Sequence, residues 1–487
     1  MRSLVPFGLL TVASLLACTD APPAGDASAD AAPADAALDS SAPPEDRPRV
    51  RPPEIPRTEP DTARAMQRQR CTFGPGAWPA ETLGQEVPVG DQMPLQHILV
   101  LMQENRSFDH YFSRLPRAGR DDVDVPPEGW TNPRADGSPV PLTHDTERCI
   151  EDVHHGWDAT HRQYNNGRMD GFVTTNDPLG ERAMTYFDET DLPFYYSLAN
   201  TFSIGDRYFC SLLGPTFPNR FYLMAGTSFG LVVNNLAGND TRQRPAQHLY
   251  SRLDDAGIDW REYSGGARMV GFFPYYGLLR AETRAHMATI DQLREDLRTG
   301  RLPPFAFIEP DYFGSGGNRV DEHPPGIPMN GERFVEGIVR ALMASPAWAT
   351  TALFILYDEH GGFADHAPPP EACEPDALTP HDGNGRAFTG RFDRLGFRVP
   401  FFVVSPYARR HYVSHRVFDH TSVLRFVEAR FGLPALTRRD ANANIPTDMF
   451  DFQNPPFMTP PTLTPSNGVD MATRDRCNAR FPGAGGL

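Results

Sequence analysis

Three stretches of the sequence each begin as an apolar run and end in acidic or amide residues. They are residues 97–105, 305–311 and 351–360. Runs this apolar and this rich in branched side chains are typical of strands buried on both faces of a parallel sheet. α/β proteins hold their ligands at the carboxyl edge of such a sheet, and oxygen ligands gathered there suit a hard or borderline divalent cation. The pattern therefore predicts a divalent metal site with the ligands Glu104, Asn105, Asp358 and Glu359. The alternative is that each of them is a strand-end residue in water.

A hydroxyl group follows a tight turn at residues 214–216, Gly-Pro-Thr. Residues 219–225 have helix-forming content, which places Thr216 at or just before the N-terminus of a helix. The free backbone N–H groups and the helix dipole at that point favour an anion, either an alkoxide or a phosphoryl oxygen. Thr216 is therefore a candidate nucleophile. Its alternative role is to cap the helix, as threonine often does, and the sequence leaves both roles open.

Two histidines lie in polar, loop-like surroundings beyond the predicted strands. His155 belongs to His154-His-Gly-Trp-Asp158, and His323 belongs to Asp321-Glu-His-Pro-Pro325. An imidazole on a loop beyond a strand's carboxyl end is well placed to act as a general acid, which we expect of His323. His155 is a candidate metal ligand, phosphate-binding group or proton donor. A structural hydrogen bond is the alternative for His155, and a plain surface position is the alternative for His323.

The elements that must position these residues alternate between strands and helices from Cys71 onward, without an internal repeat. An amphipathic pattern predicts a helix over residues 330–346. A further helix is predicted over residues 420–431, where a glycine and a proline follow as stop signals. The aromatic stretch 186–196 predicts a helix and its approach, packed on the sheet. This order favours an α/β layered fold with a mostly parallel central sheet flanked by helices.

Five motifs carry a resemblance to known proteins. They are His97-Ile-Leu-Val-Leu-Met-Gln-Glu-Asn-Arg-Ser-Phe-Asp-His-Tyr-Phe112, Met169-Asp-Gly-Phe172, Gly214-Pro-Thr-Phe-Pro-Asn-Arg220, Glu322-His-Pro-Pro325 and Asp358-Glu-His-Gly-Gly-Phe363. In this order they resemble the bacterial phosphoesterase family that includes phospholipases C and acid phosphatases, a branch of the alkaline-phosphatase-like superfamily. The resemblance runs from about Gln96 to Leu433. It implies an alkaline-phosphatase-like α/β fold.

The resemblance also implies a site and a reaction. The implied metal ligands, for a divalent cation that the sequence does not identify, are Glu104, Asn105, Asp358 and Glu359. Thr216 would be the nucleophile, and His155 and His323 would lie near the phosphate. The implied reaction is hydrolysis of a phosphate ester or phospholipid through a phosphothreonine intermediate, as in a phospholipase C or an acid phosphatase.

Two other functions compete with this one. Residues 216–220 have the outline of the sulfatase signature, in which an oxidised side chain supplies an aldehyde. Oxidation of a threonine would give a ketone instead, which argues for a phosphoester substrate. The competing class is a non-catalytic, lipid-anchored surface binding protein on the same fold.

The N-terminus has the pattern of an exported lipoprotein. A single arginine precedes the apolar segment 4–16, which is too short to span a bilayer as a mature helix and is typical of a secretory signal. Leu15-Leu-Ala-Cys18 looks like the lipobox of a bacterial lipoprotein, so residues 1–18 are expected to be a signal peptide and Cys18 to be lipidated. Ordinary cleavage near an incidental cysteine is the alternative. Because Thr19 follows the cysteine, outer-membrane anchoring is favoured, with the protein in the periplasm or on the cell surface.

The composition of residues 19–70 differs from that of the rest of the chain. This segment is mostly Ala, Pro, Asp, Ser and Arg with no aromatic residue, and such a composition buries too little apolar surface to fold. We therefore expect a disordered tether here and a catalytic domain over residues 71–487. The formal net charge of −16 argues against a nucleic-acid partner.

Five cysteines follow the lipobox, and export permits them to form disulfides. An odd count leaves at least one thiol free. Cys71 and Cys477 bracket the folded region, so a clasp between them is one prediction.

Overall fold

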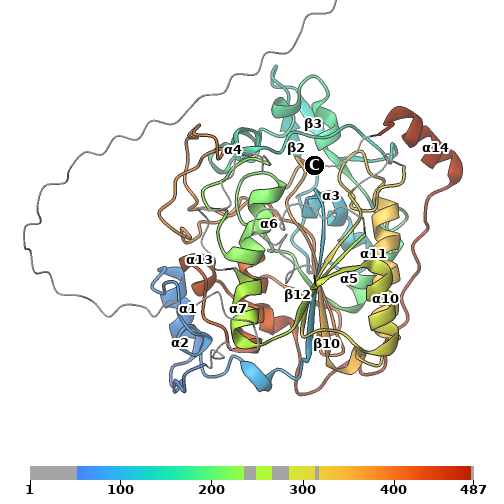
Figure 1. Ribbon diagram of the computed structural model, residues 1–487. Helices are drawn as coiled ribbons and strands as arrows, with labels where there is room; N and C mark the ends of the chain where they lie inside the picture. The colour runs from blue at the N-terminus through green and yellow to red at the C-terminus, as the bar shows by residue number, and fades with distance from the viewer. Residues whose placement is uncertain (1–51, 235–247, 266–284, 313–316, 484–487) are drawn as a thin grey trace, which may run out of the picture. The chain divides into compact units, whose positions relative to one another are not determined.

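The computed structural model describes residues 52–234, 248–265, 285–312 and 317–483. The chain divides into two compact units, residues 1–46 and 47–487, and the first lies wholly outside the described residues. The predicted signal peptide, Cys18 and the tether up to residue 51 therefore lie outside them as well. The described residues all belong to the second unit (Figure 1).

A sheet of eight strands forms the centre of this unit. In spatial order the strands are β12 (Tyr412–Ser414), β6 (Ser203–Gly205), β11 (Phe401–Val404), β10 (Thr351–Tyr357), β1 (His97–Gln103), β9 (Phe305–Glu309), β7 (Trp260–Ser264) and β8 (Met287–Thr289). Only β11 runs antiparallel to its neighbours in this sheet. The mostly parallel sheet that the sequence predicts is confirmed.

The three apolar stretches of the sequence form three adjacent strands, β10, β1 and β9. Their side chains are almost all fully buried, which explains why these runs are apolar throughout instead of alternating. In the parallel register Gln103 lies opposite Tyr357, so the residues after both strands leave the sheet at the same point.

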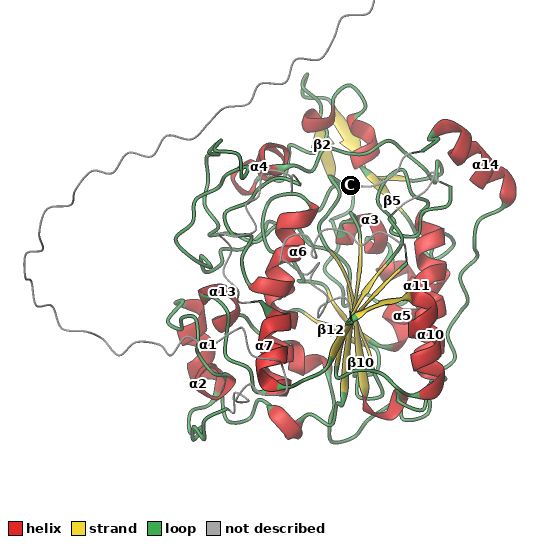
Figure 2. Cartoon of the chain, viewed as in Figure 1, coloured by secondary structure: helices red, strands yellow, loops and turns green. Residues whose placement is uncertain are grey.

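Helices cover both faces of the sheet (Figure 2). The helices are α1 (Asp61–Gln69), α2 (Pro79–Thr82), α3 (Phe108–Phe112), α4 (Trp157–Tyr164), α5 (Pro193–Thr201), α6 (Thr216–Ala225), α7 (Leu249–Ala256), α10 (Ile290–Thr299), α11 (Pro328–Met343), α12 (His420–Phe431), α13 (Arg438–Ala441) and α14 (Met471–Arg480). Figure 1 shows α6 and α7 on one side of the sheet, and α5, α10 and α11 on the other. Two small strand pairs, β2 (Thr131–Pro133) with β3 (Pro139–Pro141) and β4 (Thr143–His144) with β5 (Thr185–Tyr186), lie apart from the main sheet. Among the residues that the structure describes, no helix combines the length and the apolar character that a membrane span requires.

The predicted helices are present. The helix expected over residues 330–346 is α11, and the one expected over 420–431 has those bounds as α12. Gly432 ends α12 with a φ of 65°, a left-handed conformation that glycine adopts without strain. The aromatic stretch leads into α5, whose rings are buried.

The tether prediction is wrong for residues 61–69, which form α1. Arg68 on α1 is 2% exposed, and its guanidinium donates to Asp61 and to the carbonyl oxygen of Thr82. The ion pair with Asp61 lies within α1, and polar contacts fix the helix to the rest of the folded unit, from Arg68 to Thr82 and from the N–H of Gly84 to Asp61. An estimate from hydrophobic content alone therefore missed it.

The predicted clasp between Cys71 and Cys477 is also wrong. Cys71 pairs with Cys373, and Cys149 pairs with Cys477. Cys210 is the free thiol and is buried. Both ends of the folded unit are therefore fastened, but to interior loops and not to each other.

Candidate active site

The carboxyl ends of β1 and β10 bring the predicted metal ligands side by side. The backbone N–H of Asn105 donates to Oδ1 of Asp358 at 3.0 Å, and the N–H of Glu359 donates to the same oxygen at 2.7 Å. Glu104, Asn105, Asp358 and Glu359 are all buried. The next turn is tight, because a Cβ on Gly361 would meet the carbonyl oxygen of Asn105 at 2.2 Å.

Three of these residues and Thr216 carry buried oxygen atoms that have no hydrogen-bond partner. The atoms are Oε2 of Glu104, Oδ1 of Asn105, Oγ of Thr216 and Oε1 of Glu359. A buried polar atom without a partner costs about 1–3 kcal/mol, so such atoms are few in native proteins. Unpaired carboxylate, amide and hydroxyl oxygens are the donor set that a hard divalent cation takes.

Arg220 lies among the carboxylates. One turn after Thr216 on α6, its guanidinium donates to Glu104 at 3.0 Å, to both oxygens of Glu309 at 2.9 Å and to Asp358 at 3.4 Å. A guanidinium thus already contributes a positive charge at the sheet edge where the sequence predicts a cation. The sequence analysis quoted Arg220 within a motif but gave it no role.

Burial dominates the electrostatics of the acids. It raises the pKa of Glu104 well above its usual range, against the opposing effect of Arg220. Burial likewise raises the pKa of Glu359 to about 8, which the neighbouring His155 partly offsets. Desolvation disfavours the charged carboxylate, so these acids would be ionised more readily with a further positive charge between them.

Thr216 is the first residue of α6. The N-cap is Pro215, and the N–H of Phe217 in the first turn donates to the side chain of Asn234, so Thr216 does not cap the helix. The preceding turn is fixed by Asn219, which accepts from the N–H of Leu212 at 3.0 Å and donates to the carbonyl oxygen of Gly214 at 2.9 Å. The buried hydroxyl of Thr216 is thereby held at a helix N-terminus without a structural partner.

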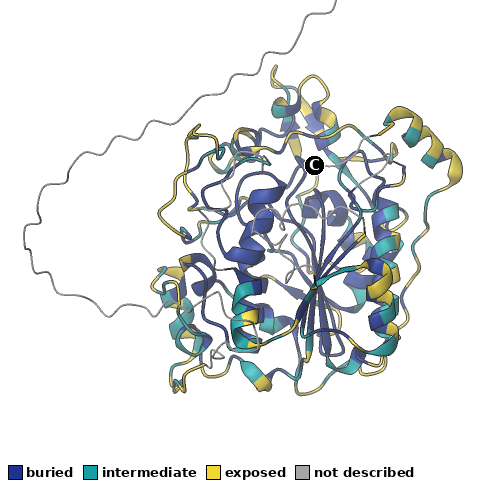
Figure 3. Ribbon diagram, viewed as in Figure 1, coloured by how far each residue is buried: buried dark blue, intermediate teal, exposed yellow. Residues whose placement is uncertain are grey.

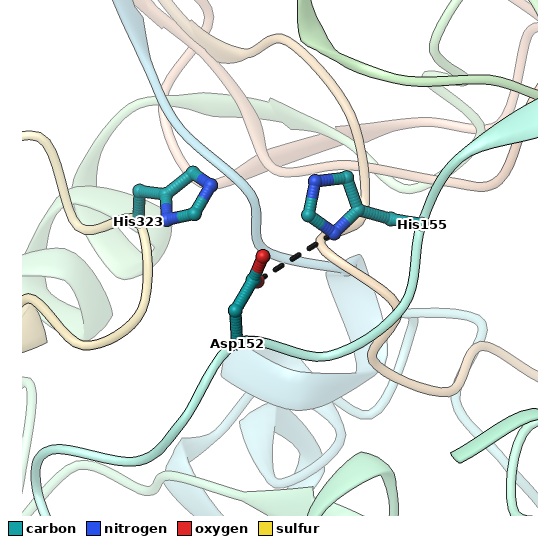
Figure 4. A group of neighbouring side chains, drawn as sticks. All are labelled: Asp152, His155 and His323. Atoms are coloured by element: carbon teal, nitrogen blue, oxygen red, sulfur yellow. Dashed lines mark ion pairs between the residues drawn. The ribbon is translucent and has the colours of Figure 1, made fainter. Parts of the chain in front are cut away.

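The two predicted histidines face each other, with Asp152 beside them (Figure 4). Their ring centroids are 5.7 Å apart. Nε2 of His155 lies 3.2 Å from the side-chain nitrogen of Asn105 and 3.6 Å from a carboxylate oxygen of Glu359. His155 thus lies beside the predicted metal ligands, and His323 lies next to His155.

The histidines differ in charge at neutral pH. Burial lowers the pKa of His155, but the carboxylates of Glu359 and Asp152 outweigh burial and raise this pKa to about 9. For His323 burial dominates and lowers the pKa to about 4. Without a ligand, His155 therefore carries a proton and a positive charge, whereas His323 is neutral.

Glu322 anchors the loop that carries His323. Its buried carboxylate accepts hydrogen bonds from the hydroxyl groups of Tyr111 at 2.5 Å, Tyr195 at 2.6 Å and Tyr357 at 2.7 Å. Its backbone carbonyl oxygen accepts from Arg106. The sequence analysis missed this anchor, because the three tyrosines lie in separate segments and only the fold brings them together.

The remaining candidate clusters are structural. Within the described residues, two other groups of three acidic or histidine side chains come close enough to share an ion, Asp109–Asp365–His366 and His144–Asp188–Asp191. In the first, Arg398 donates to Asp109 and Asp365 at 2.7 and 2.9 Å and neutralises them. In the second, Arg148 and His144 both pair with Asp191. His420 lies in hydrogen-bond contact with the carbonyl oxygen of Asp358 and the hydroxyl of Tyr208, and so orients α12.

Comparison with known proteins identifies relatives over most of the chain. The model of the "Phosphoesterase family" matches residues 95–434. "Phospholipase C B" of Mycobacterium tuberculosis is 35% identical over 438 residues, covering 77% of this chain and 81% of that protein. "Non-hemolytic phospholipase C" of Pseudomonas aeruginosa is 32% identical, covering 78% of this chain and 61% of its own length. "Non-specific phospholipase C1" of Arabidopsis thaliana is 30% identical, covering 77% and 74%.

Solved structures add little to this. One described as a protein in the alkaline phosphatase superfamily, from Vibrio parahaemolyticus, aligns over 87% of this chain and 95% of its own with 9% identity and a TM-score of 0.39. A TM-score of this size carries no argument about the function of the chain.

Proposed function

The chain belongs to the phosphoesterase family and is a phosphoric ester hydrolase, and we propose that it works through a phosphothreonine intermediate with the help of a divalent cation. The observation that carries this proposal is the set of unpaired buried oxygens on Glu104, Asn105, Thr216 and Glu359. These oxygens belong to the motifs that define the candidate site. The free-energy cost of burying them without a hydrogen-bond partner is explained by a ligand that binds to them.

The cation would be held by Glu104, Asn105, Asp358 and Glu359. All four are buried, and three of them present an oxygen that nothing in the described part of the chain satisfies. An all-oxygen set leans away from zinc. When bound, the cation would lower the pKa of the Thr216 hydroxyl and polarise a phosphoryl oxygen. Arg220 would keep Glu104 and Asp358 in place through its ion pairs with them.

Thr216 would attack phosphorus in line with the leaving alcohol. The Oγ–P bond forms as the bond between phosphorus and the leaving oxygen breaks, and water later hydrolyses the phosphothreonine. The N-terminus of the ten-residue helix α6 would stabilise a phosphoryl oxygen through its dipole and the N–H of Thr216, since the N–H of Phe217 already donates to Asn234 and Pro218 has none.

His323 would protonate the leaving alcohol, and His155 would hold a phosphoryl oxygen. His155 suits the second role because its raised pKa keeps it positively charged. His323 is neutral before substrate binds, but the negative charge of a bound phosphate ester beside it would raise its pKa and let it take up from water the proton that it then donates. The anchor at Glu322 would keep this imidazole in position.

The substrate would be a phospholipid or another phosphate ester. The relatives at 30–35% identity carry the name phospholipase C, and this supports, without deciding, the same class here. The direct experiment compares hydrolysis of a chromogenic phosphomonoester, a phosphocholine ester and a phosphodiester. Turnover of the phosphocholine ester alone would mark a phospholipase C, and turnover of the monoester alone would mark a phosphatase. No turnover of any of them would contradict the proposal and favour the non-catalytic binding protein.

We also propose that the protein is an exported lipoprotein anchored through Cys18, in the periplasm or on the cell surface. The lipobox and the apolar segment before it support this. The two disulfides, Cys71–Cys373 and Cys149–Cys477, add support, because disulfides persist in oxidising compartments.

A further inference from the structure

Helix α14 stands out from the body of the folded unit and is largely exposed (Figures 1 and 3). Two contacts hold it at the rim of the candidate site. Cys477 forms a disulfide with Cys149, six residues before His155. Asn478 accepts from the backbone N–H of Gly317 at 2.8 Å, six residues before His323. The helix is therefore fastened to both segments that lead to the two histidines.

A basic depression lies where α14 meets α10 and α11. Its volume is about 380 Å³, and Arg294, Arg333 and Arg474 line it. Arg294 pairs with the exposed Asp291, whereas Arg333 and Arg474 form no ion pair within the described part of the chain. Nε of Arg474 is buried and has no hydrogen-bond partner. The depression thus offers positive charge to an anion.

The same helix presents an apolar side chain. Met471 is 76% exposed, and it lies one turn from Arg474, so both lie on one face of α14. The helix carries three arginines against one aspartate, in a chain whose formal net charge is −16. Arginines near an anionic bilayer are attracted to it, and an exposed apolar side chain beside them can enter the boundary between headgroups and acyl chains.

We propose that α14 and the depression lined by Arg294, Arg333 and Arg474 dock the protein on an anionic lipid bilayer. The arginines bind lipid phosphates, and Met471 enters the region between headgroups and acyl chains. This docking rests on the proposed function, because it turns the rim of a phospholipid-cleaving site towards its substrate. It is separate from the Cys18 anchor, which holds the chain near a membrane without orienting the site.

A local probe tests the docking without interference from the anchor. A fluorophore sensitive to its surroundings is attached to the full chain through Met471→Cys, in a Thr216→Ala background that prevents hydrolysis. Vesicles of phosphatidylglycerol and phosphatidylcholine should shift its emission to the blue, and vesicles of phosphatidylcholine alone should not. Met458→Cys is the matched control, because Met458 is 48% exposed but lies far from α14. It follows Phe457, whose carbonyl oxygen accepts from Trp348 just before the amino-terminal end of β10, the end away from the candidate site. An equal shift at both positions, or a shift produced by inorganic phosphate alone, would overturn the proposal.

Charge variants provide an independent measurement. Arg333→Gln with Arg474→Gln should weaken partitioning onto the anionic vesicles about 25-fold, since each basic residue near such a surface contributes about a factor of five. Arg409→Gln with Arg410→Gln is the matched control. Both arginines are exposed and follow β11, away from α14, so their replacement should leave the partitioning unchanged. Both pairs should hydrolyse a soluble ester like the unaltered chain. If both double variants hydrolyse the soluble ester normally and bind the vesicles equally well, the docking surface is refuted and the proposed function is not. If the unaltered chain does not hydrolyse the soluble ester, the proposed function is refuted.

Discussion

Thr216 and Arg220 lie one turn apart on α6, and their surroundings explain why both are there. The guanidinium of Arg220 contacts three buried carboxylates, whereas the hydroxyl of Thr216 has no partner. A buried hydroxyl without a partner costs stability, so Thr216 contributes nothing to the fold that alanine would not. The two residues therefore make opposite predictions when they are replaced.

Thr216→Ala should abolish turnover and leave the fold intact. Because the proposed nucleophile is lost while the four ligands stay, we expect the rate to fall on the order of 10³-fold or more. Thr216→Ser, which keeps a hydroxyl, should retain a large part of the activity. Turnover, metal content and the denaturation midpoint of both variants are the measurements. Near-normal turnover by Thr216→Ala would remove Thr216 from the mechanism.

Arg220→Met should destabilise the fold strongly. Removing the guanidinium leaves buried carboxylates without their partner, and breaking a buried ion pair in this way costs about 3–5 kcal/mol. Arg261→Met is the control, since Arg261 is partly exposed and its partner Asp296 keeps hydrogen bonds from Tyr263 and Gln292 when the guanidinium is removed, so the loss should be smaller. Urea unfolding at neutral pH measures both. A loss for Arg220→Met no larger than for Arg261→Met would contradict the central role that the contacts indicate.

At the scale of elements, a buried carboxylate joins two helices that pack on the sheet. Glu332 on α11 accepts the backbone N–H groups of Phe194 at 2.8 Å and Tyr195 at 3.1 Å, in the first turn of α5. Burial nevertheless raises the pKa of Glu332 to about 8. The folded protein therefore binds this proton more tightly than the unfolded chain, and the associated stability is lost as pH rises from about 4.5 to about 8.

Glu332→Gln should remove that pH dependence. The amide oxygen can still accept from α5, but it carries no proton to lose. Relative to the unaltered chain, the variant should gain on the order of 3 kcal/mol in unfolding free energy between pH 4.5 and pH 7.5. Urea unfolding across this range checks it, with Glu128→Gln, at an exposed position, as a control that should leave the pH dependence unchanged. Parallel pH profiles for Glu332→Gln and the unaltered chain would show that Glu332 is ionised in the folded state.

Elements that depend on local pattern could be predicted from the sequence. β1, β9 and β10 follow from apolar runs, α12 follows from its stop signals, and the neighbouring strand ends placed Asn105 beside Asp358. What could not be predicted depends on contacts between distant segments. Arg220 meets Glu309 across 89 residues, and the hydroxyl of Tyr195 meets Glu322 across 127, and no local pattern encodes either. The disulfide partners were missed for the same reason.

At the scale of the whole molecule, the anchor and the folded unit are predicted to be separable. Cys18→Ser should block lipidation, so the chain should remain unprocessed or appear in the soluble exported fraction. The folded unit begins well after residue 18, so turnover of a soluble ester by the exported chain should be unchanged. Partitioning into detergent measures lipidation. Unchanged detergent partitioning of the variant would contradict the lipoprotein proposal.

The last prediction concerns the dependence of the whole fold on a divalent cation. Glu104 and Glu359 are buried, their pKa values are raised by burial, and Arg220 contacts only the first of them. A cation that binds their unpaired oxygens would favour the ionised forms and would bind the folded state alone. Such a ligand stabilises the fold by about 2.7 kcal/mol at a concentration 100 times its Kd. Chelation should therefore lower the unfolding temperature as well as abolish turnover, and adding the cation back should restore both.

Asp358→Asn separates metal binding from folding. The amide keeps an oxygen that can accept from the N–H of Asn105 but loses the charge that attracts the cation, so metal content should fall more than stability does. Asp296→Asn, a buried carboxyl on α10 outside the site, should leave metal content unchanged. Metal analysis of protein purified without added cations, followed by assays after exhaustive chelation, gives the decisive comparison. Full turnover and an unchanged unfolding temperature in metal-free protein would mean that Arg220 and His155 provide the positive charge of the site without a cation.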